Sequence, residues 1–319
     1  MHAVTITDAR LEWCEHPDPV AGTGELLVAV EAAGLNGADM IQRRGGYPAP
    51  PGSPDGIPGL ELAGTVVDTG PNVFRFTKGD RVMAVVGGGA QAELALVHER
   101  TAIPVPDTMP WPQAGGFPEV FTTAHDALFT QCGLSLGERV LVHGAAGGVG
   151  IAGVQLAALA GARVTATVRN ADLRGDVERI GRACGDVRAV AADAELSAHG
   201  PFDVVLELVG GPNIQADLDG LATGGRISVI GVGGGGTAEL NLLALMGKRA
   251  RIHGSTLRPR PLEQKGDAAQ RVEHHVLPWV AAGRITVPIA ATYPMAEAET
   301  AYDRFAAGGK LGKIVLVRG

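Results

Sequence analysis

The sequence predicts an α/β protein in which a parallel sheet covered by helices is combined with a second domain rich in β-structure. From Arg139 onward, short apolar segments alternate with segments of helical length, the pattern of repeated strand–helix–strand units. The N-terminal part carries only short, valine-rich runs separated by Gly, Pro and Asp, as in a small sheet or barrel. After about residue 256 the pattern changes to two helices and a final strand, so the tail is expected to return to the first domain.

The composition is that of a two-domain globular protein. With 319 residues, the chain is long enough for about two domains of roughly 100 to 200 residues each. Hydrophobic residues make up 45% and charged residues 19%, which provides a buried core and argues against a disordered chain. The net charge of −7 offers no basic surface for the phosphates of a nucleic acid, so no nucleic-acid partner is expected.

The location expected from the sequence is the cytoplasm. Cys14, Cys132 and Cys184 are odd in number and far apart, so they predict neither a disulfide framework nor a thiolate zinc cluster. The N-terminus lacks a basic segment followed by an apolar one, so no secretory signal is expected. The longest apolar stretch, 140–162, is interrupted by His143 and several glycines, which indicates a buried strand, turn and helix instead of a membrane span.

The individual elements can be placed by their apolar runs and by the residues that separate them. The expected N-terminal strands are 26–30, 62–67, 81–86 and 92–97, and the Pro-rich segment 45–54 is expected to be a surface loop. The expected central strands are 140–143, 164–168, 187–190, 203–208, 226–230 and 251–253. Helices are expected at 149–160, ended by Gly161, and at 172–183 and 213–222. The tail is expected to form helices near 265–282 and 295–307 and a strand at 313–317.

The segment 140–151, Val-Leu-Val-His-Gly-Ala-Ala-Gly-Gly-Val-Gly-Ile, has the context of a dinucleotide-binding loop, because it follows an expected strand and opens an expected helix. Ala145 stands at the first position of the G-x-G-x-x-G pattern. Gly147 allows the backbone to approach a pyrophosphate, and Gly150 allows the helix to pack on the strand. The helix N-terminus, Gly148 and Val149, supplies free N–H groups to the phosphates. A turn that needs glycine only for steric reasons is the alternative, and the repeated strand–helix units favour the cofactor.

The cofactor expected is NADPH. After the second strand, where an NAD-binding protein usually carries an acid for the ribose 2′-hydroxyl, this sequence has Val168-Arg169-Asn170. A guanidinium in place of a carboxylate suits a 2′-phosphate, and Arg174 is expected to assist. Such an arginine–phosphate contact contributes on the order of 1.5 to 3 kcal/mol. The alternative is that Arg169 is only a solvated residue at the strand end.

With these segments the chain resembles the zinc-free quinone oxidoreductases of the medium-chain dehydrogenase/reductase family, and most of all their p53-inducible type. The matching motifs extend over nearly the whole chain and lie at 33–39, 44–47, 58–64, 145–150, 254–260 and 312–316. The resemblance implies a GroES-like β-barrel substrate domain formed by both chain ends, 1–117 and 256–319. It also implies that a Rossmann domain, 118–255, with a doubly wound parallel sheet is inserted into this barrel domain and binds NADP.

The same resemblance predicts that no metal takes part. Zinc-dependent alcohol dehydrogenases carry a Cys ligand where this chain has Asn36 and a His ligand where it has Leu60. Neither residue is a suitable zinc ligand, Glu61 lacks its companions, and the sequence has no closely spaced cysteine set for a structural zinc ion. Without a Lewis acid to polarise an alcohol, reduction of a conjugated acceptor is the expected chemistry.

The resemblance also implies the residues of the site. Asn36 and Tyr47 are expected beside the nicotinamide and the acceptor, Asn36 as a hydrogen-bonding group and Tyr47 as a stacking ring or a proton donor. A loop tyrosine packed by neighbouring prolines is the alternative for Tyr47, and relatives often carry another tyrosine where Ile41 stands. Asp39 is expected either to orient the loop backbone or to act chemically. Further cofactor contacts are expected at Thr123, Gly210, Gly231, Val232, Ser255 and Arg258.

The function expected is transfer of a hydride from NADPH to a quinone without zinc. The alternatives are an NADPH-dependent enoyl or 2-alkenal reductase on the same scaffold and an NADPH-binding sensor or structural protein with little turnover, against which Asn36 and Tyr47 count. A homodimer is expected through the last strand of the parallel sheet, near 250–255, because an unpaired edge strand offers free N–H and C=O groups. The expected partners are therefore a small quinone or enone and a second copy of the chain, with no membrane.

Overall fold

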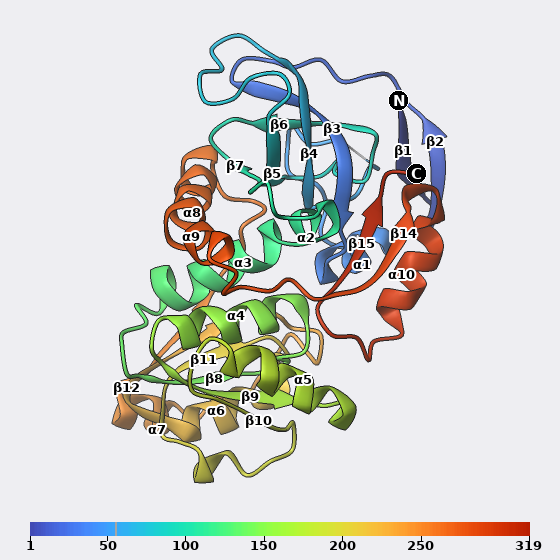
Figure 1. The fold of residues 1–319 in the computed structure, drawn as a ribbon. Coiled ribbons are helices and arrows are strands. Elements are labelled where there is room, and N and C mark those ends of the chain that lie inside the picture. Colours follow the sequence, from blue (N-terminus) through green and yellow to red (C-terminus); the bar gives the residue numbers. More distant parts are fainter. Residues whose placement is uncertain (55) are drawn as a thin grey trace. The chain divides into compact units, whose positions relative to one another are not determined.

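The computed structural model describes residues 1–54 and 56–319, which divide into two compact units (Figure 1). Unit 1 contains Met1–Thr122, Leu257–Gly283 and Val287–Gly319, and unit 2 contains Thr123–Thr256 and Arg284–Thr286. Both ends of the chain therefore belong to unit 1, and the middle of the chain forms unit 2. Each unit is built around its own sheet.

Unit 1 contains a seven-stranded sheet in which strands from both ends of the chain pair. The strand order is β14-β15-β3-β4-β5-β7, and β6 pairs with β3 outside this path. Their bounds are β3 Glu25–Gly34, β4 Glu61–Thr69, β5 Arg81–Val85, β6 Leu94–His98, β7 Ala102–Pro104, β14 Ile289–Pro294 and β15 Lys313–Val317. β15 runs antiparallel to β3, with Val315 opposite Gly34, so the C-terminal strand completes the N-terminal sheet. β1 (His2–Thr7) and β2 (Arg10–Glu15) form a separate hairpin.

The apolar faces of these strands and of one C-terminal helix form the core of unit 1. The helical segments of the unit are α1 Gly37–Arg43, α2 Trp111–Gly115, most of α3 Pro118–His125, α8 Leu262–His275, α9 Leu277–Ala281, η4 Met295–Glu297 and α10 Ala298–Ala306. Leu26, Leu62 and Tyr302 of α10 are among the fully buried core residues. The Tyr302 hydroxyl donates a hydrogen bond to Gln91 Oε1 at 3.0 Å, so its polar tip is satisfied inside the core.

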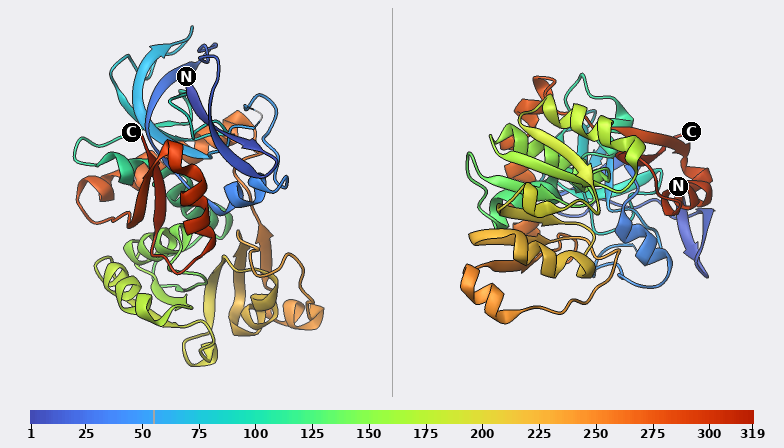
Figure 2. Two further views of the ribbon diagram at one scale, coloured as in Figure 1. Left: turned by 90° about the vertical axis from the view of Figure 1, so that its right-hand side faces the viewer. Right: turned by 90° about the horizontal axis from the view of Figure 1, so that it is seen from below.

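Unit 2 is a parallel sheet of six strands with helices on both faces. The order is β10-β9-β8-β11-β12-β13, with bounds β8 Arg139–Val142, β9 Arg163–Val168, β10 Val187–Ala191, β11 Phe202–Glu207, β12 Leu221–Val229 and β13 Arg251–Gly254. The helical segments are η1 Asp126–Gln131, α4 Gly148–Leu159, α5 Ala171–Arg182, η2 Leu196–Ala198, η3 Gly211–Asn213, α6 Ile214–Gly220 and α7 Leu242–Lys248. The yellow-green α4 and α5 lie on one face and the gold to orange α6 and α7 on the other (Figure 2, right). The predicted doubly wound sheet is thereby confirmed.

The strand order of unit 2 changes direction between β8 and β11. After β8 the chain builds outward through β9 and β10, and it then returns to β11 on the other side of β8. In open α/β sheets, ligands bind at such a reversal, outside the carboxyl ends of the strands. The glycine-rich loop between β8 and α4 lies at this point, and α4 is covered so completely that Ile151, Val154 and Leu156 are all buried.

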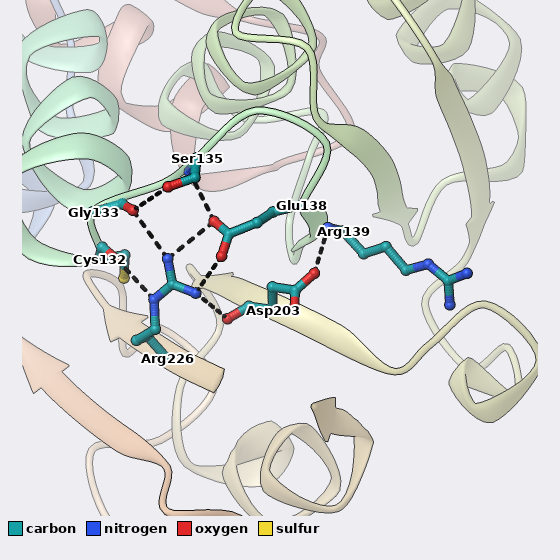
Figure 3. A network of polar contacts seen from close by, with 7 residues as sticks. All are labelled: Cys132, Gly133, Ser135, Glu138, Arg139, Asp203 and Arg226. Carbon is teal, nitrogen blue, oxygen red and sulfur yellow. Dashed lines mark hydrogen bonds and ion pairs between the residues drawn. The ribbon is translucent and has the colours of Figure 1, made fainter. Parts of the chain in front are cut away.

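Arg226 of β12 ties several segments together at the amino end of the same sheet (Figure 3). Its Nε donates to Cys132 O at 2.7 Å, and its Nη1 and Nη2 lie 2.7 and 3.0 Å from the two carboxylate oxygens of Glu138. Nη1 also donates to Asp203 O at 3.2 Å. Such a bidentate arginine–carboxylate pair fixes geometry as well as charge. The amino end of the sheet is therefore locked by the protein's own contacts, and the carboxyl end carries the glycine-rich loop.

Most of the expected elements occur, and several of them differ in their bounds or continuity. The single helix expected near 265–282 is two helices, because Pro278 in the first turn of α9 lacks the N–H that would continue α8. The helix expected at 295–307 begins with the 3₁₀ turn η4, and the strand expected at 92–97 starts only at Leu94. Gly161 adopts φ +80° just after α4, as predicted for a helix stop. Among the described residues, no helix is both long and apolar enough to cross a membrane.

Candidate active site

The glycine-rich loop of unit 2 has the shape that a phosphate group requires. Gly147 is the N-cap of α4 and has no side chain that could cap this helix, so the first N–H groups of α4 can serve a ligand. A Cβ added at Gly150 would collide with Gly144 O and lie 2.6 Å from Ala145 Cα, so only glycine permits this approach of helix to loop. A Cβ at Gly147 would meet nothing closer than Gly144 O at 3.4 Å, which leaves the loop surface open there.

The other predicted loop residues anchor this arrangement. Ala145 is fully buried and donates its N–H to Thr167 O at 3.1 Å, which ties the loop to β9. Gly148 and Val149 form the first turn of α4. The residues present therefore fit the pyrophosphate of a dinucleotide.

Two arginines lie at the carboxyl end of β9. Arg169 directly follows the strand and is exposed, and Arg174 on α5 donates from Nε to Val168 O at 3.3 Å. Asn170 is the N-cap of α5, where its Oδ1 accepts the N–H of Asp172 at 3.1 Å. The end of β9 is thus followed by the guanidinium of Arg169 and the amide of Asn170. The first carboxylate after the strand is that of Asp172, in the first turn of α5.

Glycines also line the loops after β11 and β12. Gly210 adopts φ +105°, its N–H donates to Glu207 Oε1 at 2.7 Å, and a Cβ there would lie 2.6 Å from Gly235 O. A Cβ on Gly231 would similarly meet the backbone of the β11 loop at 2.5 Å. Val232 is 51% exposed beside these glycines. The two loops therefore approach each other as closely as backbone allows.

The other two cofactor contacts predicted in unit 2 lie at its ends in sequence. Thr123 is buried in α3, and Ser255, which follows β13, donates from Oγ to Asp126 Oδ2 at 3.3 Å. Arg258 belongs to unit 1, where it contacts Tyr47.

A buried cluster of one histidine and two carboxylates follows β8, and sequence reasoning missed it. His143 Nε2 lies 2.8 Å from Asp217 Oδ1 and 3.8 Å from Glu207 Oε2, and its Nδ1 lies 3.0 Å from Thr167 Oγ1. Burial acts to lower the pKa of His143, but the hydrogen bond and charge of Asp217 outweigh it and raise that pKa. Because Glu207 also holds the N–H of Gly210, the cluster fixes the backbone after β11. The available signal was that His143 ends one expected strand and Glu207 is the last residue but one of another.

In unit 1, Asn36 is the N-cap of α1 and the centre of a buried network. Its Nδ2 donates to Glu61 Oε1 at 2.9 Å and to Gly34 O at 3.3 Å, and its Oδ1 accepts from Lys313 Nζ at 2.7 Å. Lys313 Nζ also donates to Leu35 O at 2.6 Å. Sequence reasoning missed the role of Lys313, because Asn36 and Leu35, to which its ammonium donates, are 277 and 278 positions away in the sequence.

Asp39 orients the backbone of Asn36, which is the first of the two roles expected for it. Its Oδ2 accepts the N–H of Asn36 at 2.8 Å, and its Oδ1 is buried with no hydrogen-bond partner among residues 1–54 and 56–319. Burial raises the pKa of Asp39 to about 7, against the opposing hydrogen bond from Asn36 and charge of Lys313. The carboxyl is therefore partly protonated near neutral pH.

Tyr47 is half-buried in the loop after α1 and has a strained backbone. Its φ of +57° lies in the left-handed region, which costs a residue with a Cβ roughly 1 to 2 kcal/mol. Burial raises the pKa of Tyr47, so its hydroxyl keeps its proton at neutral pH. The guanidinium carbon of Arg258 lies 5.0 Å from the ring centroid, within the range of a cation–π contact.

Two family models match the chain. The one described as "Alcohol dehydrogenase GroES-like domain" matches residues 22–107, and the one described as "Zinc-binding dehydrogenase" matches residues 184–316. The first matches most of the β-rich part of unit 1, which confirms the GroES-like fold predicted for it.

Similar proteins extend over nearly the whole chain. The quinone oxidoreductase of Rattus norvegicus is 32% identical over 306 residues, which cover 94% of this chain and 91% of that protein. The solved structure of the quinone oxidoreductase from Thermus thermophilus, described also in complex with NADPH, has a TM-score of 0.84 and 32% identity, over 99% of this chain and 100% of that one. An alcohol dehydrogenase superfamily protein from Novosphingobium aromaticivorans has a TM-score of 0.88 and 28% identity, over 100% of both chains.

The residues present do not fit the zinc ion that one family description names. The ammonium of Lys313 already lies 2.6 Å from Glu61 Oε1, so a second cation there would be repelled, and Leu60 is a buried apolar side chain without a donor atom. In unit 2, His143, Glu207 and Asp217 place three possible ligand atoms within 4.8 Å of one another. These side chains are already engaged with one another and with the backbone: His143 is hydrogen-bonded to Asp217, and Glu207 accepts a hydrogen bond from the N–H of Gly210.

Proposed function

Because the chain belongs to the quinone oxidoreductase group of the medium-chain dehydrogenase/reductase family, we propose that it is an enzyme that transfers a hydride from NADPH to a quinone and uses no metal ion. The observation that carries this proposal is the combination of a glycine-rich helix start, whose N-cap Gly147 has no side chain, with Arg169 at the end of β9. The helix start offers N–H groups to the pyrophosphate, and the guanidinium offers a partner to the 2′-phosphate. An NAD-specific protein would carry a carboxylate in place of Arg169.

The role proposed for the other residues is to position the cofactor and the acceptor and to allow the transfer of one proton to the reduced acceptor. NADPH, when bound, supplies the hydride. Asn36 is held in one orientation by Lys313 and Glu61, and its Oδ1 keeps a second lone pair for a donor on the cofactor or the acceptor. Tyr47 offers an aromatic ring on which a planar acceptor can stack. The proton that completes reduction comes from water or from the Tyr47 hydroxyl.

An enoyl reductase on the same fold is the second candidate, and one observation favours it. The half-buried Tyr47 carries a hydroxyl that is protonated at neutral pH, so it can donate to the carbanion that hydride addition leaves on an enone, which needs a placed donor more than a reduced quinone does. If Tyr47 only stacks, Tyr47→Phe retains most of its activity and Tyr47→Ala raises KM. If it donates the proton, Tyr47→Phe alone lowers kcat by about 10²-fold or more.

The test is a screen of NADPH oxidation with small quinones and small enones, run on wild type and on both Tyr47 variants. The proposal expects quinones to be the better acceptors and Tyr47→Phe to be nearly as active as wild type. Faster turnover of enones together with a severe Tyr47→Phe defect would replace it by the enoyl reductase. NADPH that binds without being consumed by either class would indicate a binding protein.

We also propose that the protein is a homodimer formed through β13. This strand stands at the edge of the parallel sheet, where its outer N–H and C=O groups can pair with those of a second copy. The preceding helix, α7, exposes Leu242, Leu243 and Met246 by 63%, 78% and 70%, an apolar surface suited to the same contact. Light scattering should give twice the monomer mass, and Leu243→Glu combined with Met246→Glu should lower it. A monomer mass for the wild type at micromolar concentration would refute the dimer.

The cytoplasmic location expected from the sequence stays a prediction.

A further inference from the structure

Arg258 is a buried arginine whose guanidinium is shared between three segments of unit 1. It is only 4% exposed. Its Nε donates to Gly87 O at 2.7 Å, its Nη1 to Tyr47 O at 2.8 Å and its Nη2 to Gln42 Oε1 at 2.8 Å. All three nitrogens therefore have acceptors within the protein, in the fixed fork geometry that lysine cannot reproduce.

One of these three contacts is a rigid anchor. A Cβ on Gly87 would collide with Ser53 Oγ and lie 2.9 Å from Pro50 Cγ, so the backbone there is tightly packed. The carbonyl of Gly87 thus gives the guanidinium a fixed position. A second contact, to Gln42, reaches the last turn of α1, the helix that Asn36 caps.

The third contact holds the strained residue. A bulky side chain in the left-handed region persists only where the surroundings hold it there. Arg258 supplies such a constraint twice, because it binds the carbonyl of Tyr47 and lies against its ring. The preceding Gly45 also has a positive φ, of +80°, so the loop before Tyr47 has little stiffness of its own.

We propose that Arg258 is a positioning residue that fixes Tyr47 in its left-handed conformation and holds it in one arrangement relative to α1 and Asn36. Its effect on catalysis rests on the proposed function, in which Tyr47 contacts the acceptor. The competing role is the direct contact with NADPH that the sequence motif suggested. The two roles differ in what the removal of the guanidinium weakens: acceptor use in the first, cofactor binding in the second.

The first experiment compares Arg258→Met and Arg258→Lys with Arg271→Met, an exposed arginine on α8 that serves as the control. For both Arg258 variants we expect KM for a small quinone to rise about tenfold or more, kcat to change less, and the Kd of NADPH, measured by its fluorescence, to stay within about twofold. An NADPH Kd weakened about tenfold with an unchanged quinone KM would overturn the proposal. Arg258→Lys is included because it keeps the charge but cannot make all three hydrogen bonds of the guanidinium. A wild-type KM for the quinone in Arg258→Lys would therefore also contradict a role for these three hydrogen bonds.

The second experiment tests whether Arg258 acts through Tyr47. In a Tyr47→Ala background, Arg258→Met should raise the quinone KM by no more than about twofold, because the residue that it positions is already gone. If Arg258→Met raised the quinone KM by the same factor in the Tyr47→Ala background as in wild type, the proposal would be overturned. A variant that loses its circular dichroism spectrum is replaced in this cycle by Arg258→Lys.

The third experiment reads the loop itself and needs no acceptor. Arg44 is exposed between α1 and Tyr47, so trypsin should cleave there about tenfold faster in Arg258→Met than in wild type or Arg271→Met. Equal cleavage rates would overturn the positioning role. If the wild type reduces no quinone but this cleavage difference is present, the proposed function fails while the positioning of Tyr47 stands.

Discussion

The ammonium of Lys313 lies 2.6 Å from the carboxylate of Glu61 in the interior of unit 1, where the two side chains are 3% and 0% exposed. They come from β15 and β4, on either side of β3. A buried ion pair is stable only when further hydrogen bonds replace the lost water. Here Asn36 and Leu35 O accept from Lys313, and Glu119 N donates to Glu61 at 2.9 Å. The orientation of the Asn36 amide therefore depends on this charge pair.

Removing one member of this pair should be costly. Lys313→Met leaves the Glu61 carboxylate buried without its counter-charge, and we expect a loss of about 3 to 5 kcal/mol in the free energy of unfolding, measured with urea. The double variant with Glu61→Gln should lose less than the sum of the two single variants, since neither charge remains. Lys78→Met, at an exposed site, is the control and should change stability by less than about 0.5 kcal/mol. A Lys313→Met protein as stable as this control would show that the pair contributes little.

Asp39 should make the protein less stable as the pH rises. Burial raises the pKa of Asp39 from an ordinary 3.8 to about 7, so the folded state binds this proton more tightly than the unfolded chain. The contribution of this group is thus fully present below pH 3.8 and is lost by about pH 7, a fall on the order of 4 kcal/mol.

Asp39→Asn keeps an acceptor for the Asn36 N–H but cannot ionise, so its stability should lack this fall. Urea unfolding at about pH 5 and about pH 8 should show the variant gaining relative to wild type at the higher pH. Asp267→Asn, at an exposed site on α8, should run parallel to wild type. If the stability of Asp39→Asn also changed with pH in parallel with that of wild type, the Asp39 carboxyl would be ionised over the whole range from about pH 5 to about pH 8.

Arg169 should set the choice of cofactor. Arg169→Asp removes the partner of the 2′-phosphate and places an acceptor there for a ribose hydroxyl, so kcat/KM for NADPH relative to NADH should fall by about tenfold to a hundredfold. Arg188→Asp changes the charge at an exposed site on β10 of the same sheet and should leave the ratio near that of wild type. Equal losses in the two variants would indicate a general effect of charge instead of a contact.

Two glycines of unit 2 should respond in opposite ways to alanine. At Gly150 the added methyl would meet the backbone of Gly144 and Ala145, so we expect the Kd of NADPH to rise about tenfold or more and stability to fall by about 1 to 3 kcal/mol. At Gly175, inside α5, nothing lies within 4 Å of the added methyl, so alanine should stabilise the protein by about 0.4 to 1 kcal/mol. Normal NADPH binding by Gly150→Ala would contradict the close approach of α4 to the loop.

Local pattern was enough to predict the parallel sheet of unit 2, because short apolar segments such as 140–143 and 203–208 alternate with segments of helical length. Long-range pairing was not predictable in the same way. Arg258 and Tyr47 are 211 positions apart, and neither residue carries a mark that points to the other. The left-handed backbone of Tyr47 was missed for a different reason, since Gly45 and Gly46 beside it are the residues that a sequence would assign to such a turn.

The most direct test of hydride transfer from NADPH to a quinone without metal is the initial rate of NADPH oxidation by a small quinone, measured on protein treated with a strong chelator. We expect one NADPH consumed for each quinone reduced, a rate equal to that of untreated protein, and a kcat/KM at least about tenfold higher than with NADH. A rate that vanishes with the chelator and returns with zinc, or NADPH that no quinone can oxidise, would contradict that chemistry.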